Sequence, residues 1–589
     1  MNKKLKILQL SILILSALFS ILHISFKLDI SIIAFFISTI YTVIIFYFGY
    51  IRLDKNIDIK KLSLVRKLYQ YLPFVQIAIF VLRRAGAKGC SLSFDIICEV
   101  IWILSSVASI VFLYFIDDKR IYKYCEKFSN AKSSLPVIEK NIKKKILIEI
   151  LEWVDAFVQA AFTVTLINLF VFQLYEIPSE SMVSEFLVKD RVVGVKIFSG
   201  PKFPLSDAGL PQIKNYKRGD IVIFRNPHYK KDRQSEVKNF VYQLVYMLTF
   251  TGVNLNVDEY GNLKADPLVK RVTGMEGEQL MMQDGVLYCR TKNSPDFQIV
   301  NEENKWAEWN LNELPKDLKA KVRDIPLTNE QYKLMLEVEK NRNALNLIDC
   351  AKEAKEIVSS FKKYNLAKQK NISEEEITKF YNLNDLYAYN LFAENDKICR
   401  RIMSVDGGNQ WFEKFMTSWI DNIPEDFDLV GNNLYDDANF RLNVMIKLTF
   451  GKLILRDAKL IKEGMSASQI IRDEQRLALM KEAESLYIYV ILLDRRNMPV
   501  FPANDTNGNP RYIPENNYFL MGDNRFNSLD MRHSYDQNIV NISLFDEMSV
   551  TYYTNMSPQF VPTKDIIGTA SLRFWPLSRF GFTNKGNEN

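Results

Sequence analysis

The stretch Ile177-Pro-Ser-Glu-Ser181-Met182 comes directly after a long apolar run, residues 148–174. Further along, Val269-Lys270-Arg271-Val272 has the composition of a strand and leads to a Gly-containing turn. Burial among apolar neighbours disfavours the charged form of a lysine. A neutral lysine can then take the proton of a serine hydroxyl and activate it as a nucleophile. The two stretches together predict a Ser/Lys hydrolase site at a membrane surface.

The composition argues against several other kinds of site. A net charge of +7 over 589 residues is too small to indicate nucleic-acid binding. The chain has three histidines, and His23 lies inside an apolar run, which leaves His228 and His533 for any Ser-His-Asp triad. The six cysteines form no CxxC pair, so they predict neither a disulfide framework nor a zinc site. We expect no metal and no cofactor.

Apolar runs dominate the first part of the chain. Crossing a bilayer takes about 20 apolar residues. Four runs reach or approach that length, at residues 6–26, 29–51, 95–116 and 148–174. A fifth run, Leu68–Leu82, is shorter and contains Pro73. The sequence therefore predicts a multi-span helical anchor over residues 1–147, with 148–176 as its final transmembrane helix.

The charged loops indicate how these runs are oriented. Residues 52–67 and 118–145 are rich in Lys and Arg, which favours the cytoplasmic side for both. An even number of crossings then separates them, so Leu68–Leu82 must cross as the partner of 95–116. Five spans result, and the last delivers Ser181 outside the cytoplasm. Arg83-Arg84 fits poorly, because it would lie in a short outer loop; three spans plus a non-crossing hairpin give the same final side.

Beyond Tyr175 the chain reads as a β-rich domain. Short β-branched runs are bounded by Gly, Pro, Asn and Asp, as strands usually are. They lie at residues 191–195, 219–224, 268–272, 285–288 and 518–521. We therefore expect a mostly-β core built from 177–299 and 511–582, followed by a short tail, 583–589.

Several motifs in this domain carry a resemblance to one family. Ile177–Met182 resembles the serine box of bacterial type I signal peptidases, and Val269–Gly277 resembles their lysine box. Arg218–Phe224 is similar to the strand between the two boxes. Gly522–Arg532 resembles the family's late box, and Phe560–Arg579 its closing strands. The five motifs occur in the family's order, and the resemblance covers about 148–290 and 511–582.

The resemblance implies a role for each matching residue. Ser181 would be the nucleophile and neutral Lys270 its general base, with Val269 and Val272 among the apolar neighbours. Ser179 would donate to the oxyanion together with the backbone N–H of Ser181.

Three further residues match positions that support the base. Ser528 would orient Lys270 by a hydrogen bond. Asp530 and Arg532 would form a supporting ion pair near the site.

The sequence also departs from the family. Glu180 stands where the family commonly has Gly, so it would be strained if the backbone needs a positive φ, and its carboxylate would oppose an oxyanion. Ser184-Glu185 replaces Pro-Thr, and Gly277-Glu278 replaces Gly-Asp. Residues 533–559 lengthen the path from the late box to the closing strands. With Ser181 and Lys270 present, these departures bear on rate and substrate range.

Residues 300–510 are predicted to be a large helical insertion in the β core. Capping boxes at Thr328, Ser373 and Ser466 mark helix starts, and apolar residues recur after them at helical spacing. The insertion is either a packing or stability appendage, or a lid or partner-docking module. A separate apolar stretch, 240–250, is either a helix in the outer leaflet or a buried core helix.

The fold class predicted is thus a multi-span α-helical anchor and a mostly-β signal-peptidase-like core with a helical insertion. The resemblance implies a plasma-membrane serine endopeptidase, facing outward, that removes signal peptides. Its partners would be secretory preproteins, the lipid bilayer and the export translocon. Two alternatives stay open, a Ser/Lys peptidase dedicated to few substrates and a catalytically silent preprotein-binding scaffold.

Overall fold

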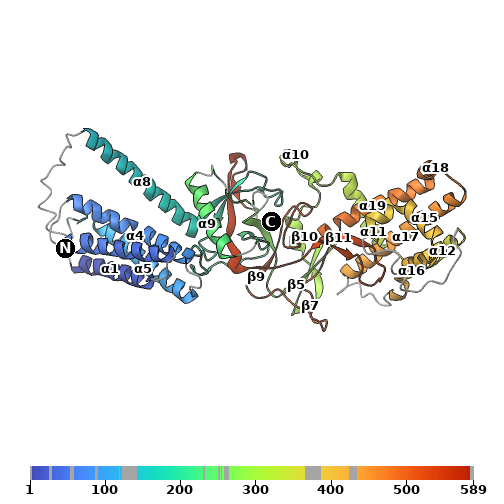
Figure 1. The fold of residues 1–589 in the computed structure, drawn as a ribbon, viewed down its shortest axis with the longest axis horizontal. Helices are drawn as coiled ribbons and strands as arrows, with labels where there is room; N and C mark the ends of the chain where they lie inside the picture. The colour runs from blue at the N-terminus through green and yellow to red at the C-terminus, as the bar shows by residue number, and fades with distance from the viewer. Residues whose placement is uncertain are drawn as a thin grey trace.

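The structure is a computed structural model. It describes residues 3–24, 30–52, 59–86, 91–117, 120–121, 142–229, 232–249, 253, 255–257, 264–364, 386–423 and 434–583. The capping box predicted at Ser373, nearly all of the basic loop 118–145 and most of the tail 583–589 lie outside these residues. Figure 1 shows a helical bundle at one end, sheets in the middle and a second helical part at the other end.

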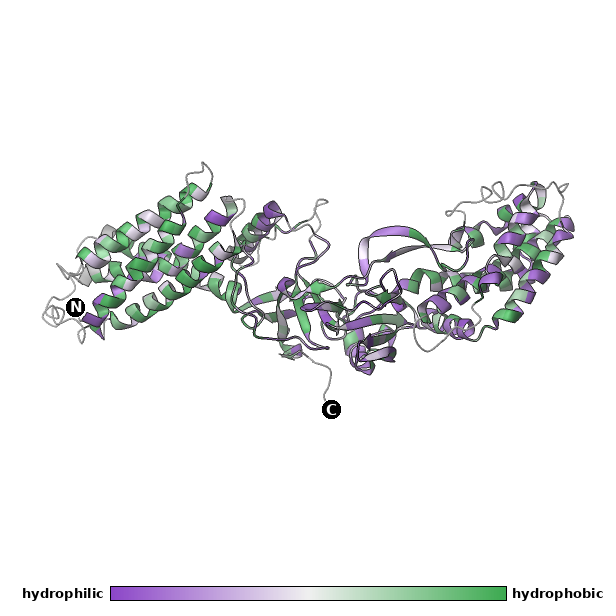
Figure 2. Ribbon diagram, turned by 90° about the horizontal axis from the view of Figure 1, so that it is seen from below, coloured by the Kyte–Doolittle hydropathy of each residue, from purple (hydrophilic) through white to green (hydrophobic). Residues whose placement is uncertain are grey.

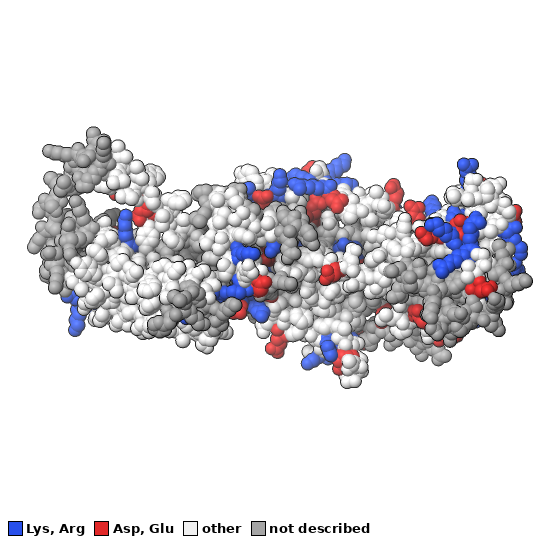
Figure 3. Space-filling view, viewed as in Figure 1, with Lys and Arg blue, Asp and Glu red and all other residues white. Residues whose placement is uncertain are grey.

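The bundle is made of apolar helices. They are α1 (Lys3–Leu22), α2 (Ile30–Ile44) with η1 (Ile45–Arg52), α4 (Ile59–Gly86), α5 (Leu92–Phe115) and α8 (Ile142–Phe170). By length and composition alone, four stretches of the described chain are suited to cross a membrane, Lys3–Leu22, Ile30–Ile51, Leu92–Phe115 and Ile146–Phe170. Figure 2 shows the hydrophobic colouring of these helices, and charged side chains are sparse over them on the face in Figure 3.

Helix α4 contains the predicted short run Leu68–Leu82. It is continuous through Pro73, contacts α2 and α5, and accepts a hydrogen bond from Trp102 Nε1 at the Pro73 carbonyl (2.8 Å). At its end, Arg84 lies 3.4 Å from Asp95 on α5 and donates to the carbonyl of Leu205. These partners account for Arg84, one of the two arginines that fitted the predicted outer loop poorly, and they attach this end of the bundle to the sheet domain.

The central sheet has eight antiparallel strands. They are β1 (Phe172–Glu176), β2 (Arg191–Val195), β3 (Ile221–Phe224), β4 (Leu268–Gly274), β9 (Asn517–Met521), β12 (Val561–Pro562), β13 (Ile566–Trp575) and β14 (Gly581–Phe582). Their order is β1-β2-β13-β3-β4-β9-β12, with β14 beside β13. Short turns η6 (Thr563–Asp565) and η7 (Leu577–Arg579) flank β13. Val222, Val272 and Phe519 are fully buried in the core of this sheet, so the predicted mostly-β core is confirmed.

A second sheet extends this core. Its order is β7 (Ser294–Ile299), β6 (Val286–Thr291), β5 (Glu278–Gln283) and β8 (Met498–Phe501). Strand β8 lies inside the range 300–510 that was predicted to be helical, and the prediction is wrong there. Tertiary pairing decides the structure of this segment, because Phe501 and Met498 pair with Leu280 and Met282 and complete the sheet.

The described residues between 329 and 496 are mostly helical. They form α11 (Asn329–Asn343), α12 (Leu347–Lys362), α14 (Ala388–Ala393), α15 (Asn395–Ser404), α16 (Gly408–Thr417), α17 (Leu434–Lys462), α18 (Ala467–Ile471) and α19 (Glu474–Arg496). Shorter turns are η3 (Asn301–Lys305), η4 (Leu311–Glu313), α10 (Lys316–Lys319) and η5 (Ile420–Asn422). The capping boxes predicted at Thr328 and Ser466 are confirmed.

A hairpin from the late part of the chain completes the helical core. Strands β10 (His533–Asn541) and β11 (Thr551–Met556) pair with each other, and Ile542, Val550 and Tyr552 are buried in the same cluster as Trp411 and Phe450. This packing explains the long separation between the late box and the closing strands.

The apolar stretch 240–250 belongs to helix α9 (Arg233–Leu248), which contacts α8. The described side chains of α9 are exposed or half-buried. The alternative of a buried core helix is therefore wrong.

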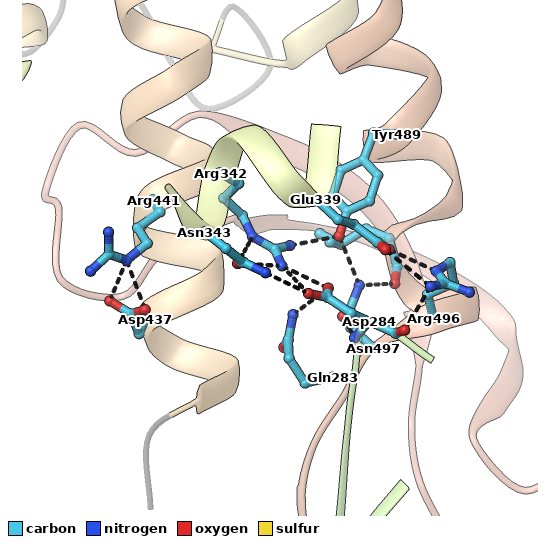
Figure 4. A network of polar contacts seen from close by, with 11 residues as sticks. Gln283, Asp284, Glu339, Arg342, Asn343, Asp437, Arg441, Tyr489, Arg496 and Asn497 are labelled. Atoms are coloured by element: carbon cyan, nitrogen blue, oxygen red, sulfur yellow. Dashed lines mark hydrogen bonds and ion pairs between the residues drawn. The ribbon is translucent and has the colours of Figure 1, made fainter. Parts of the chain in front are cut away.

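A polar network holds the helical part against the second sheet (Figure 4). Asp284, in the turn between β5 and β6, accepts two hydrogen bonds from Arg342 Nη2 on α11 (2.6 and 2.5 Å). Arg342 is fully buried and also donates to the Tyr489 hydroxyl on α19. Arg496 donates to Glu339 (2.7 Å) and to the carbonyl of Asp284 (2.6 Å). One turn thus receives two arginines from two helices.

We predict that Arg342→Ala lowers the melting temperature of the detergent-solubilised chain by several degrees. Truncation leaves Asp284 and the Tyr489 hydroxyl without their buried partner, and breaking a buried pair costs about 3–5 kcal/mol. The matched control is Lys352→Ala, which breaks an exposed pair with Asp349 and should leave the melting temperature nearly unchanged. Equal melting temperatures for the two variants would contradict the role given to the network.

Candidate active site

The serine turn follows β1 and is anchored from both sides. Ile177, Met182 and Phe186 are buried against strand residues that include Val192 and Ile223. The backbone of Ile177 exchanges hydrogen bonds with the segment that closes the turn, donating to the carbonyl of residue 190 and accepting from the N–H of residue 189 (both 2.8 Å). Apolar packing and a closed loop therefore fix the position of Ser181.

Lys270 meets Ser181 from the opposite side. It lies on β4, where it pairs with Val222 of β3, and its Nζ donates to Ser181 Oγ at 2.5 Å. Lys270 is 3% exposed and Ser181 8%. Burial lowers the pKa of Lys270 to about 8, although the charges of Asp530 and Asp523 raise it in part. A neutral amine is thus accessible near physiological pH, in contact with a hydroxyl.

The other two predicted serines lie on either side of this pair. Ser179 is exposed, and its Oγ is 3.3 Å from Ser181 Oγ. The Ser528 hydroxyl is buried and has no hydrogen-bond partner among the described residues, so the predicted bond to Lys270 is not formed here. Ser528 instead lies against Gly522. A side chain at 522 would collide with Ser528 Oγ and the Ser181 carbonyl, which is why only glycine fits.

Asp530 and Arg532 form the predicted ion pair. Arg532 donates through Nε to Oδ1 (2.9 Å) and through Nη2 to Oδ2 (3.0 Å), and both side chains are fully buried. Burial would raise the pKa of Asp530, but the Arg532 guanidinium outweighs it and holds that pKa well below its usual range. Asp530 also accepts the N–H of Gly522, while Arg532 donates to the carbonyl of Arg495. The pair therefore connects the late box to the end of α19.

A second buried ion pair escaped the sequence analysis. Arg271 donates through Nε and Nη2 to the two carboxylate oxygens of Asp523 (2.8 and 2.6 Å). The next residue, Asn524, donates its N–H to the Ser181 carbonyl (3.2 Å) and its Nδ2 to the Glu180 carbonyl (3.1 Å). These residues lie inside the boxes quoted from the sequence, but their pairing depends on β4 and β9 being neighbours, which no local pattern reveals.

Glu180 behaves differently from either expectation. It is absent from the residues with positive φ, so the expected backbone strain does not occur. Its buried carboxylate accepts the backbone N–H groups of Arg323 (2.5 Å) and Asp324 (3.0 Å) and is directed at these two amides. Beside it, Leu311 and Leu314 pack against Val183 and Leu187 (all buried). Segment 311–325 therefore lies against the serine turn and is attached to it by Glu180.

The sheet brings a hydroxyl and a buried amine together, which is the arrangement of a Ser/Lys hydrolase site. Comparison with known proteins identifies the family. A family model described as signal peptidase, peptidase S26, matches residues 150–343 and 458–575, which is more than half of the chain. The chain belongs to this family. The unmatched residues between the two ranges, 344–457, lie within the predicted insertion.

One curated relative adds to this finding. The signal peptidase I of Buchnera aphidicola subsp. Baizongia pistaciae (strain Bp) is 33% identical over 92 residues. The match covers 15% of this chain and 30% of the relative, so the chain spans under a third of that relative's length. No solved structure matches the chain.

We predict that Glu180→Ala accelerates amide exchange in the segment containing Arg323 and Asp324. The two N–H groups lose their acceptor, and losing a charged acceptor costs about 1–3 kcal/mol, so exchange should rise roughly tenfold or more. Hydrogen exchange followed by mass spectrometry on peptides from 316–326 measures this. Glu337→Ala, an exposed carboxylate on α11, is the matched control. Unchanged exchange in the Glu180 variant would show that its carboxylate does not hold the segment.

Proposed function

We propose that this chain is a membrane-anchored serine endopeptidase that cleaves signal peptides from exported preproteins. The observation that carries the proposal is the hydrogen bond from Lys270 Nζ to Ser181 Oγ, in a buried site of a signal peptidase family chain. Ser181 is the nucleophile and neutral Lys270 is the general base.

The first step forms an acyl-enzyme. Ser181 Oγ attacks the scissile carbonyl while its proton passes to Lys270 Nζ, and the carbonyl oxygen becomes an oxyanion. The Ser179 hydroxyl and the backbone N–H of Ser181 are the proposed donors to that oxyanion. When the C–N bond breaks, Lys270 returns the proton to the departing amine. A water molecule then attacks the ester carbonyl while its proton passes to Lys270 Nζ. Lys270 returns that proton to Ser181 Oγ as the ester C–O bond breaks.

Asp530 and Arg532 support this chemistry without touching the reacting atoms, and Ser528 supports it through Lys270. The ion pair fixes the N–H of Gly522 and so the position of the late box beside Ser181. Ser528, whose hydroxyl is unpartnered among the described residues, is the proposed donor or acceptor for Lys270 once substrate reshapes the site. Substrate would lie extended beside a strand and bond through its backbone. The resemblance to signal peptidases implies small residues at the first and third positions before the cut.

The proposed location is the plasma membrane, with Ser181 on the outer side. The proposed side rests on the basic segments 52–67 and 118–145, whose Lys and Arg content favours the cytoplasm. Five crossings are proposed, because α4 packs between α2 and α5 along the bundle.

The domains proposed are 1–147 and 148–176 in the membrane and 177–299 with 511–582 as the core. Helix α9, beside α8, would lie in the outer leaflet, and preproteins, lipid and the export translocon are the proposed partners.

The helical insertion 300–510 bears on the substrate range. Glu180 attaches residues 323 and 324 to the serine turn, which favours a dedicated peptidase over a general one. A catalytically silent preprotein-binding scaffold is the remaining alternative. A panel of preproteins presented to the purified chain separates the three: broad cleavage, narrow cleavage, or binding without cleavage.

We predict that Ser181→Ala, Lys270→Ala and Lys270→Arg each lower preprotein cleavage by about a thousandfold or more. Removing either member of the pair abolishes its function, and an arginine does not deprotonate in this pH range. Appearance of mature protein on gels or by mass spectrometry measures the rate. Ser404→Ala, an exposed serine on α15, is the control and should cleave normally. Normal cleavage by both Ser181→Ala and Lys270→Ala would contradict the proposal.

We predict that kcat/KM rises with pH through about 8 and then levels off, because only the neutral amine of Lys270 accepts the proton. Asp530→Asn removes a negative charge that raises this pKa, so the rise should move to lower pH. A pH–rate series on one peptide substrate compares the two proteins, with thermal melts reporting whether the variant folds. A profile that falls over this range, or that moves to higher pH in the variant, would contradict Lys270 as the base.

A further inference from the structure

An open pocket of about 340 Å³ lies between segment 307–315 and α11. Its walls include Glu308, Trp309, Asn310, Glu313, Leu314 and Tyr332. These residues belong to the insertion, and neither the resemblance nor the proposed mechanism gives them a role.

The pocket is connected to the nucleophile by short contacts. Ser184 Oγ, in the serine turn, donates to Glu308 Oε1 at 2.8 Å. Glu308 forms a parallel bridge with Asn524, and the N–H of Asn524 donates to the Ser181 carbonyl. The wall of the pocket is therefore linked to Ser181 through one residue, Asn524. This places it within the reach of the first few residues of a bound chain.

The position of the pocket selects one part of the substrate, if the proposed function holds. In a signal peptide the apolar membrane segment precedes the cleavage site, and the mature chain follows it. Helix α8 and β1 lead from the bundle to Ser181, whereas α10 and α11 lie toward the opposite end of the molecule (Figure 1). With the apolar segment on the bundle side, the residues after the cut extend toward the pocket.

The residues that line the pocket determine which side chains it can bind. Two carboxylates, Glu308 and Glu313, face a space that also has aromatic walls, and no Lys or Arg is among its described lining residues. Glu308 is half-buried, so its charge is less screened than at an open surface. Arg496, a cation beside the pocket, lies 4.8 Å from the Trp309 ring and is paired with Glu339. Asn310 donates to Glu313 Oε1, and no hydrogen bond to the other carboxylate oxygen is formed among the described residues.

We propose that this pocket binds a Lys or Arg side chain in the first few residues after the scissile bond and so sets which preproteins are cleaved. A cationic side chain complements both carboxylates and packs against the aromatic walls. An acidic side chain at the same position is repelled by the two carboxylates. The inference deepens the proposed function and rests on it.

The test uses the full chain in detergent and three peptides that differ only after the cut, with Lys, Gln or Glu at the second and third positions. At pH 8 the Lys peptide should be cleaved roughly three- to tenfold faster in kcat/KM than the Gln peptide, mainly through KM, and the Glu peptide slowest. In Glu308→Gln/Glu313→Gln the Lys-to-Gln ratio should fall toward one. Glu337→Gln is the charge-matched control and should keep the ratio.

The experiment distinguishes failure of the pocket proposal from failure of the proposed peptidase activity. Equal cleavage of the three peptides, or a ratio that survives the double substitution, overturns the pocket while Ser181-dependent cleavage still stands. If no peptide is cleaved, fluorescence anisotropy with dye-labelled peptides on the Ser181→Ala chain decides. Tighter binding of the Lys peptide that is lost in the double variant supports the pocket, and equal binding of all three overturns it. Thermal melts of each variant check that it folds.

Discussion

A lysine that is 3% exposed loses most of its hydration, and the uncharged amine is then favoured. The site surrounds Lys270 with two carboxylates, Asp530 and Asp523, which by themselves would keep it protonated. Each carboxylate is instead paired with its own arginine, Arg532 and Arg271, through two charge-assisted hydrogen bonds. The acids therefore organise the late box. Their charges still raise the pKa of Lys270, but burial lowers it more, and Arg532 offsets part of their effect.

The close approach of three chain segments makes this arrangement possible. Strand β4 brings Lys270 and Arg271 beside β9, and β9 runs directly into Gly522. The absence of a side chain at 522 allows Ser528 and the Ser181 carbonyl to lie against the backbone. Close packing of this kind transmits small shifts, because interiors have few voids. The same segments are fixed at their far side by Arg532, which donates to the carbonyl of Arg495 at the end of α19.

Much of the site was predictable because its chemistry lies in short sequence motifs. The family prediction is confirmed, and Ser181 and Lys270 meet as their boxes suggested. The capping boxes at Thr328 and Ser466 depend on four residues and were equally readable. The features that the sequence did not predict depend on tertiary contacts. Strand β8 pairs with β5 across the insertion, and Arg271 finds Asp523 only because β4 and β9 are adjacent. Local patterns contain no information on such partners.

The outcome for Glu180 links the insertion to the site. A carboxylate beside an oxyanion is costly unless other donors satisfy it. Here two backbone N–H groups of the insertion do so, and the packing of Leu311 and Leu314 on the serine turn holds those donors in place. Glu180 and segment 311–325 are therefore coupled, because the segment supplies the two donors that the buried carboxylate accepts. The insertion is thus in direct contact with the serine turn.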